Sequence, residues 1–199
     1  RGHYPEYSTY SAGEYGIKAR YLLAGEMGFA PKRFHYPAKF LSDEALIIAY
    51  RPDITIFNKD EEQLNIKQWL LKGNTLILIP ERETVGSLWI FDMISEMKDW
   101  HEVLNIGKIT VTWYGVGGGR ICVMDQEDYF LNVNLRDSDA GVAFIGALDR
   151  AGVREVYFNE YYHNIQKPAP GVWELIGAAG QLVLIQLVLV LILAVVRGW

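Results

Sequence analysis

The sequence predicts an α/β fold, a doubly wound and mostly parallel three-layer sandwich, followed by a C-terminal transmembrane helix. Continuous apolar runs of strand length, such as 45–50 and 75–79, suit the middle of a parallel sheet. Segments with helical spacing alternate with these runs, as the crossovers of such a sheet require. Finally, the 22 residues 175–196 carry no charge, and a helix of that length spans a bilayer core.

The first elements follow from capping and apolar runs. Ser11 and Glu14 have the spacing of a capping box, which predicts a helix that begins close after them. Gly28 is a natural end for that helix, because glycine readily adopts the left-handed conformation found after helices. Short strands are expected at 33–36 and at 45–50.

A second helix and strand complete one crossover unit. Asn58 or Asp60 caps the helix, and acidic residues in its first turn match the positive end of the helix dipole. Gly73 ends this helix. The next strand, 75–79, is closed by Pro80.

The later elements are predicted from spacing. Helical spacing of apolar and aromatic residues predicts a helix over 87–104, and another helix is expected at 140–151. Strands are predicted at 109–114, 120–124 and 155–158. The glycines 115–119 join two strands and precede no helix, so they indicate a hairpin rather than a phosphate-binding loop.

Composition excludes several classes of function. The chain has 199 residues, a formal net charge of -5 and a pI near 5.4, so we expect no nucleic-acid partner. The single cysteine, Cys122, cannot form an internal disulfide, and its place inside an apolar strand argues against a catalytic thiol. The sequence indicates no cofactor.

Four regions are expected along the chain. They are an extracytoplasmic α/β domain at 1–166, a juxtamembrane linker at 167–174, the transmembrane helix at 175–196 and the start of a truncated cytoplasmic tail at 197–199. Arg197 favours a cytoplasmic C-terminal side under the positive-inside rule. Because the chain starts at Arg1 without methionine, we expect the intact gene to supply an earlier membrane or signal segment.

The best polar constellation follows the last strand. Glu160 and His163 lie just beyond 155–158, and ligands of open α/β sheets bind outside the carboxyl ends of the strands. These two side chains suit an acid and base pair, or a metal site completed by Asp125 or His35. The alternative interpretation is structural, with Glu160 hydrogen-bonded to backbone amides. No metal site is predicted.

Other polar residues are assigned by position. Ser11 and Asp125 are expected to line the same sheet edge as Glu160 and His163, forming a ligand-binding site. Within the apolar segment, Gln181 and Gln186 are the strongly polar side chains, and we expect them to hydrogen-bond to neighbouring helices.

Three segments together resemble a bacterial family called domain of unknown function 4350. They are 7–16 before the first helix, 68–76 before a strand, and 158–163 ahead of the membrane helix. The resemblance implies an extracytoplasmic α/β domain held in the cell membrane, with a sheet similar to class I glutamine amidotransferase-like or flavodoxin-like folds. It also implies a genomic association with a MoxR-type ATPase.

Two functions are compatible with the sequence. The first is a non-catalytic domain that binds a ligand or a protein partner within a membrane complex, since no nucleophile is recognisable. The alternative is a hydrolase acting on sugar or envelope substrates, with Glu160 and His163 as acid and base. That alternative requires Glu160, His163 and Asp125 to converge on one point.

Overall fold

The structure is a computed structural model, and it describes residues 5–134 and 138–165 together with a few positions from 182 to 197. The chain divides into two units, Arg1–Gln166 and Lys167–Trp199. In the second unit Gln186 is helical and exposed, whereas Gln181, the predicted linker and most of the predicted membrane segment lie outside the described residues. Within the part of the chain that is described, no helix combines the length and apolar character that crossing a bilayer needs.

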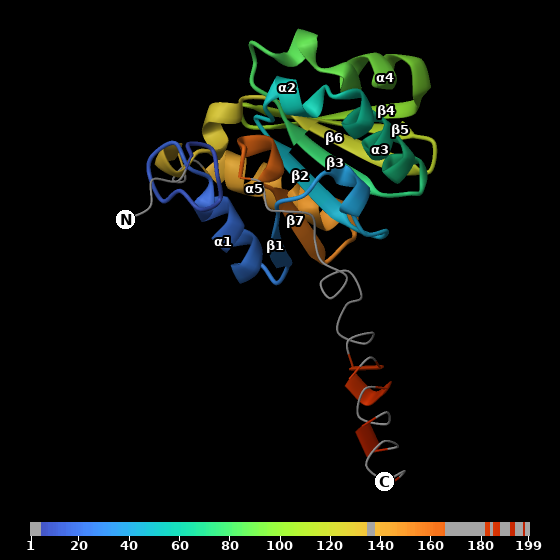
Figure 1. Cartoon of the computed structure of the whole chain (residues 1–199). Helices are drawn as coiled ribbons and strands as arrows, with labels where there is room; N and C mark the ends of the chain where they lie inside the picture. The colour runs from blue at the N-terminus through green and yellow to red at the C-terminus, as the bar shows by residue number, and fades with distance from the viewer. Residues whose placement is uncertain are drawn as a thin grey trace. The chain divides into compact units, whose positions relative to one another are not determined.

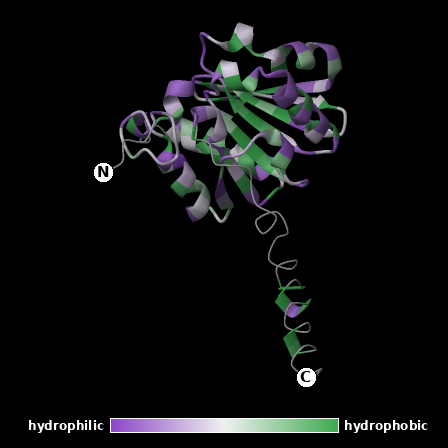
Figure 2. Ribbon diagram, in the orientation of Figure 1, coloured by the Kyte–Doolittle hydropathy of each residue, from purple (hydrophilic) through white to green (hydrophobic). Residues whose placement is uncertain are grey.

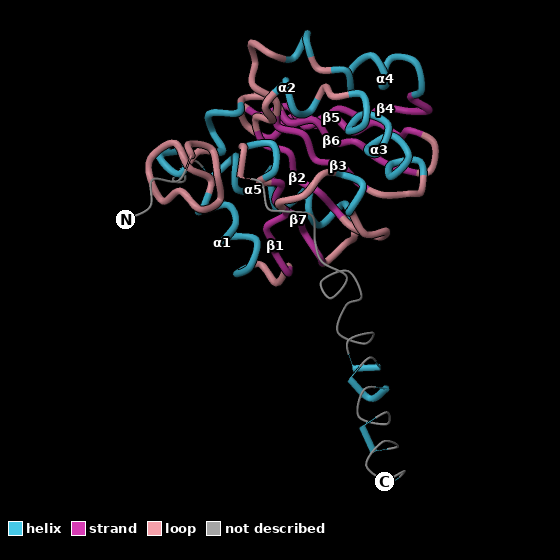
Figure 3. Tube along the Cα trace, in the orientation of Figure 1, coloured by secondary structure: helices cyan, strands magenta, loops and turns pink. Residues whose placement is uncertain are grey.

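A seven-stranded mixed sheet forms the centre of the first unit, in the order β1-β7-β2-β3-β6-β5-β4 (Figure 1). The five strands from β1 to β6 in this order run parallel, β5 is antiparallel to β6, and β4 is antiparallel to β5. Figure 3 shows these strands in magenta, side by side in the centre of the unit. The strands are β1 (Ala30–Phe34), β2 (Leu46–Tyr50), β3 (Thr75–Ile79), β4 (Lys98–Ile106), β5 (Ile109–Val116), β6 (Gly119–Met124) and β7 (Glu155–Asn159). The predicted α/β fold with a mostly parallel sheet is confirmed.

Helices cover both faces of this sheet. They are α1 (Lys18–Glu26), α2 (Ile54–Phe57), α3 (Asp60–Leu71), α4 (Trp89–Met97) and α5 (Ser138–Ala151). Side chains of α1 and α5 share one buried cluster with the sheet, and those of α2, α3 and α4 share a second cluster on its other face. The arrangement is therefore a helical layer on each side of a central sheet.

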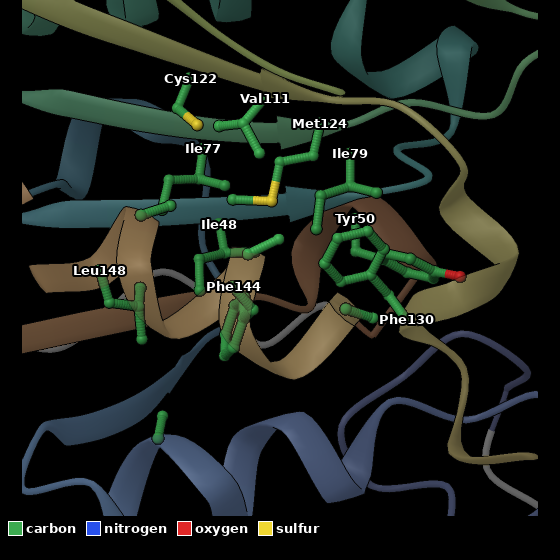
Figure 4. Close-up of a cluster of buried hydrophobic side chains, with 14 of the residues drawn as sticks. Ile48, Tyr50, Ile77, Ile79, Val111, Cys122, Met124, Phe130, Phe144 and Leu148 are labelled. Carbon is green, nitrogen blue, oxygen red and sulfur yellow. The ribbon is translucent and has the colours of Figure 1, made fainter. Parts of the chain in front are cut away.

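The central strands are buried because their sequences are apolar on both faces. Every residue of β2 and of β3 is buried, as expected for strands covered by helices on both sides. Figure 2 shows the hydrophobic green concentrated in the central strands. On the α5 side, Ile48, Ile77 and Cys122 from three neighbouring strands point towards Phe144 and Leu148 of the helix (Figure 4). β5 instead alternates buried and partly exposed residues, which fits a strand near the edge of the sheet.

The predicted helix over 87–104 is wrong in its second half. The helix ends at Met97, and 98–106 forms β4, which pairs with β5 over eight registered positions from Lys98 to Ile106. From Glu102 onwards the side chains alternate between the two faces of the sheet, with Leu104 and Ile106 packed against the buried cluster. A period of two is the pattern of a strand, and the pairing with β5 stabilises it.

The predicted capping box is also wrong. The first helix begins at Lys18, its N-cap is Ile17, and no side chain of the N-cap residue accepts a hydrogen bond. The Asn132 side chain instead accepts a hydrogen bond from the backbone amide of Ala19 at 2.9 Å. A residue that follows β6 therefore supplies the cap that Ser11 was expected to supply.

The glycine-rich connection forms the predicted hairpin. β5 and β6 are antiparallel, and Val116 pairs with Gly119 beside the turn. Gly117 has a φ of +57°, a conformation that favours glycine. Gly119 packs against the backbone of Leu70, where a Cβ atom would overlap the carbonyl oxygen. The glycines thus allow the hairpin to pack closely against α3.

Candidate functional site

The carboxyl ends of the five parallel strands meet at one edge of the sheet, the edge at which open α/β folds bind ligands. The residue that directly follows each strand is polar in four of the five cases. In sheet order they are His35 after β1, Glu160 after β7, Arg51 after β2, Pro80 after β3 and Asp125 after β6.

Glu160 is buried, with 1% of its surface exposed. Its carboxylate accepts hydrogen bonds from the Ser8 hydroxyl at 2.7 Å and from the backbone amide of Thr9 at 2.8 Å. The Thr9 hydroxyl donates a further, short hydrogen bond to the same group. Three donors from the N-terminal segment thus satisfy this carboxylate, so its role in the structure is to hold residues 8 and 9 against β7.

Two arginines reinforce the attachment of this N-terminal segment. The guanidinium of Arg33, in β1, lies 4.3 Å from the centre of the Tyr10 ring and donates to the Thr9 hydroxyl at 2.8 Å. Arg51 lies 4.0 Å from the centre of the Tyr7 ring. Cation–π contacts of this kind stabilise by about 0.5–2 kcal/mol each. The segment therefore covers the sheet edge at β1, β7 and β2.

His35 lies under this cover, whereas His163 lies beside Glu160 after β7. His35 is buried and its Nε2 atom is 2.9 Å from the Tyr10 hydroxyl. Burial lowers the pKa of His163, although the neighbouring Glu160 carboxylate and a hydrogen bond to the Tyr50 backbone oppose the shift. The backbone amide of His163 donates to the Glu160 carbonyl at 3.1 Å. Glu160 and His163 are thus adjacent at the carboxyl end of β7.

Ser11 lies on the same N-terminal segment, and its backbone makes the hydrogen bonds that hold it there. The Ser11 amide donates to the Ser8 carbonyl at 3.2 Å, and the Asn132 side chain donates to the Ser11 carbonyl at 3.0 Å. The segment is therefore tied at one end to Glu160 and at the other to Asn132.

Asp125 lies apart from this group. It follows β6, which β2 and β3 separate from β7, so three strand spacings of about 4.8 Å put it roughly 14 Å from Glu160. One of its carboxylate oxygens accepts a hydrogen bond from the Thr110 amide. Glu160, His163 and Asp125 therefore do not converge on one point.

A crevice opens beside Asp125, between the ends of β3 and β6. After β3 the chain crosses to α4 on one face of the sheet, and after β6 it crosses to α5 on the other face. Adjacent strands whose connections diverge in this way leave a crevice at their carboxyl ends. Its volume is about 260 Å³, and it is lined by Pro80, Arg82, Val85, Phe91, Val123, Asp125, Gln126 and Glu127.

The crevice combines an apolar wall with charged groups at its rim. Val85, Phe91 and Val123 provide the wall. The Glu127 side chain accepts a hydrogen bond from the Arg82 backbone amide at 3.1 Å, which fixes the two segments relative to each other. The sequence did not indicate Arg82 or Glu127 as site residues. The signal for the crevice in the sequence was Asp125, which directly follows a predicted strand.

Cys122 is unsuited to catalysis. It is a free thiol with 0% of its surface exposed, and burial raises its pKa. A buried thiol with a raised pKa contributes little thiolate at neutral pH, so it is a poor nucleophile.

Among residues 5–134 and 138–165, no group of three or more His, Cys, Asp or Glu side chains is arranged to hold a metal ion. Comparison with known proteins adds no relative: no family model, no curated protein and no solved structure matches this chain.

Proposed function

We propose that this chain is a non-catalytic, membrane-anchored domain that binds a small ligand in the crevice between β3 and β6. The observation that carries the proposal is the position of this crevice, where the crossovers after two adjacent parallel strands diverge. Ligands of open α/β sheets occupy that position because both flanking connections leave it uncovered. The Asp125 carboxylate stands at its rim, as expected of a binding residue.

The lining favours a small ligand with an apolar body and a positively charged group. Asp125 and Glu127 bring two carboxylates to the crevice, against one guanidinium from Arg82. Phe91 and Val123 offer an apolar surface on which a ring or an aliphatic chain packs. An ammonium group beside Asp125 would form a charge-assisted hydrogen bond with the carboxylate oxygen that faces away from Thr110.

Titration of the full chain with small primary amines, such as phenethylamine, tests this proposal by calorimetry. Asp125→Asn keeps the oxygen that accepts from Thr110 but removes the charge, so we expect it to weaken binding about 10- to 100-fold. Asp128→Asn is the matched control, because Asp128 is exposed and does not line the crevice. Absence of binding across the panel, or equal loss in both variants, would overturn the proposal.

Two features support a non-catalytic role. The Glu160 carboxylate, the strongest candidate acid in the sequence, already accepts three hydrogen bonds from Ser8 and Thr9. Cys122 is buried. The hydrolase alternative required Asp125 to join Glu160 and His163, and two intervening strands separate Asp125 from them.

The membrane anchor and the place of the domain outside the cytoplasm belong to the same proposal. They are supported by the uncharged run 175–196, by Arg197 after it, and by the resemblance to the family of unknown function. The resemblance also supports a sheet related to class I glutamine amidotransferase-like or flavodoxin-like folds. It further supports a protein partner in a bacterial envelope complex associated with a MoxR-type ATPase.

Orientation is testable because the native thiol is buried. Val133→Cys introduces a thiol at a position with 51% of its surface exposed. If the domain is extracytoplasmic, a membrane-impermeant maleimide should label this variant in intact cells that express the gene, and the wild type should stay unlabelled. Labelling only after the cells are lysed would place the domain in the cytoplasm.

A further inference from the structure

β4 forms an outer edge of the sheet and is strongly exposed. In the described part of the chain its strand partner is β5, and its other side pairs with no strand. Seven of its nine residues are exposed to solvent, including Val103 with 50% of its surface exposed, and Leu104 and Ile106 are partly buried. An edge of this kind presents unpaired backbone N–H and C=O groups, which template the addition of another strand.

Protection against such pairing is confined to the first half of β4. Charged side chains and bulges are the usual protective features of edge strands. Lys98, Asp99 and Glu102 lie in the first five residues, and the register with β5 shifts between Lys98 and Trp100. The remaining four residues, 103–106, contain neither charge nor proline.

The two faces of β4 differ in their contacts. Leu104 is opposite Val111 of β5 and packs with it on the α5 side of the sheet. Val103 is opposite Thr112, so its side chain lies on the other face, beside a partly exposed threonine. An exposed valine in an unprotected strand edge is the part of the molecule best suited to a strand–strand interface.

We propose that β4 pairs antiparallel with β4 of a second copy of this chain, with Val103 on the two-fold axis, so that the two sheets become continuous. In this register the facing pairs are Trp100 with Ile106, His101 with Asn105, Glu102 with Leu104, and Val103 with itself. None of these pairs opposes like charges, and each joins residues of the same face.

The charge pattern of β4 favours the register with its axis at Val103 over the register with its axis at Glu102. A two-fold axis at Glu102 would set two carboxylates directly opposite each other, which is unfavourable. With the axis at Val103, Glu102 instead remains paired with the Arg150 guanidinium of its own chain, with an Nη1 to Oε1 distance of 3.2 Å. The self-complementary sequence therefore favours a second copy over an unrelated strand as the occupant of this edge.

Disulfide crosslinking of the full chain in detergent micelles tests the register directly. Residues on a two-fold axis have Cβ atoms about 4.5–5.5 Å apart, so Val103→Cys should crosslink to itself under mild oxidation. Asn105→Cys alone should not, because its copies would be four residues out of register, about 14 Å along the strand. His101→Cys combined with Asn105→Cys should restore crosslinking.

Two further variants separate this interface from association through other parts of the chain. Val103→Lys places two ammonium groups at the axis and should weaken dimerisation about tenfold or more, measured by light scattering across a concentration series. Val142→Lys, at a similarly exposed position on α5, is the matched control and should leave the dimer unchanged. A monomer at all concentrations, equal effects of both lysines, or crosslinking of Asn105→Cys as strong as that of Val103→Cys would overturn the proposal.

Discussion

Ser8 and Glu160 are 152 positions apart in the sequence, yet the Ser8 hydroxyl donates a hydrogen bond to the Glu160 carboxylate at 2.7 Å. The contact joins the segment before α1 to the residue after β7, so the two ends of the described domain meet at the carboxyl edge of the sheet. A buried carboxylate with three donors from one segment is a strong attachment, because hydrogen bonds to charged groups are stronger than neutral ones.

Replacing Glu160 should release that attachment. Glu160→Ala leaves the hydroxyls of Ser8 and Thr9 and the Thr9 amide without their acceptor, so we expect the free energy of unfolding to fall by about 2–4 kcal/mol. Hydrogen exchange at the Thr9 amide should accelerate more than exchange in β2 or β3. Urea unfolding and exchange mass spectrometry check the two effects.

Glu155→Ala is the control for this variant. Glu155 lies on the same strand, but its pairing with Lys32 is exposed, and exposed ion pairs contribute little. We expect its stability to stay within about 0.5 kcal/mol of the wild type. If Glu160→Ala were equally mild, the N-terminal segment would not depend on Glu160.

Stability should also depend on pH through Glu62. Burial raises the pKa of this carboxyl, although hydrogen bonds from Tyr162 and from the Ala38 amide oppose the shift. The folded state therefore retains a proton that the unfolded state has lost, and this contribution to stability declines as pH rises from about 4.5 through the folded pKa. Glu62→Gln should remove that decline, which urea titrations at a series of pH values would show. The same dependence of stability on pH in Glu62→Gln and in the wild type would contradict this prediction.

His163 should act in the opposite direction. Burial lowers its pKa, so on acidification the unfolded state takes up a proton near pH 6.5 while the folded state still resists it. Stability should therefore fall as pH drops below about 6.5, and His163→Gln should flatten this part of the profile. NMR titration of the His163 ring provides a direct check: a midpoint at or above 6.5 would refute the prediction.

The thiol of Cys122 should be protected by the fold. Because its side chain is fully buried behind α5, labelling requires unfolding, and a domain stable by about 5 kcal/mol should react roughly 5,000-fold more slowly than the unfolded chain. Maleimide labelling with and without guanidinium chloride measures the ratio. In the same assay Val133→Cys should react rapidly at its new thiol without denaturant.

The central fold was predictable because it depends on local composition. The runs that became β2 and β3 are apolar at every position except Thr75, and no other element of a water-soluble domain accommodates such runs so simply. The hairpin between β5 and β6 was predictable for a similar reason, since its glycines adjoin two apolar strands.

The sequence misled where two periodicities overlap. Within 98–106, the apolar residues Trp100 and Leu104 satisfy a helical spacing of four, while Leu104 and Ile106 satisfy the spacing of two found in a strand. Pairing with β5 decides between them, and that pairing depends on a segment that follows in the chain.

The site depended on contacts between distant parts of the chain. Glu160 was recognisable as a residue at the sheet edge, but nothing local indicated that Ser8 and Thr9 would occupy its carboxylate. Likewise, Ser11 has the spacing of a helix cap, yet Asn132 provides the cap from more than a hundred residues away. Helix propensity reflects residues that are close in sequence, whereas the contacts of Glu160 and the helix cap from Asn132 depend on tertiary packing.

The last strand of the sheet, β7, lies between β1 and β2, and β1 has no other strand partner in the described domain. During synthesis β1 therefore emerges from the ribosome long before β7. Residues 30–34 cannot pair with 155–159 until those residues have also emerged. Until then the edge of β2 stays open to other chains in the crowded environment of synthesis. We expect the nascent domain to be most vulnerable to aggregation and to depend most on chaperones during this interval. We also expect it to fold slowly for its size, because the pairing of β1 with β7 closes the longest loop of any strand pairing in the described domain.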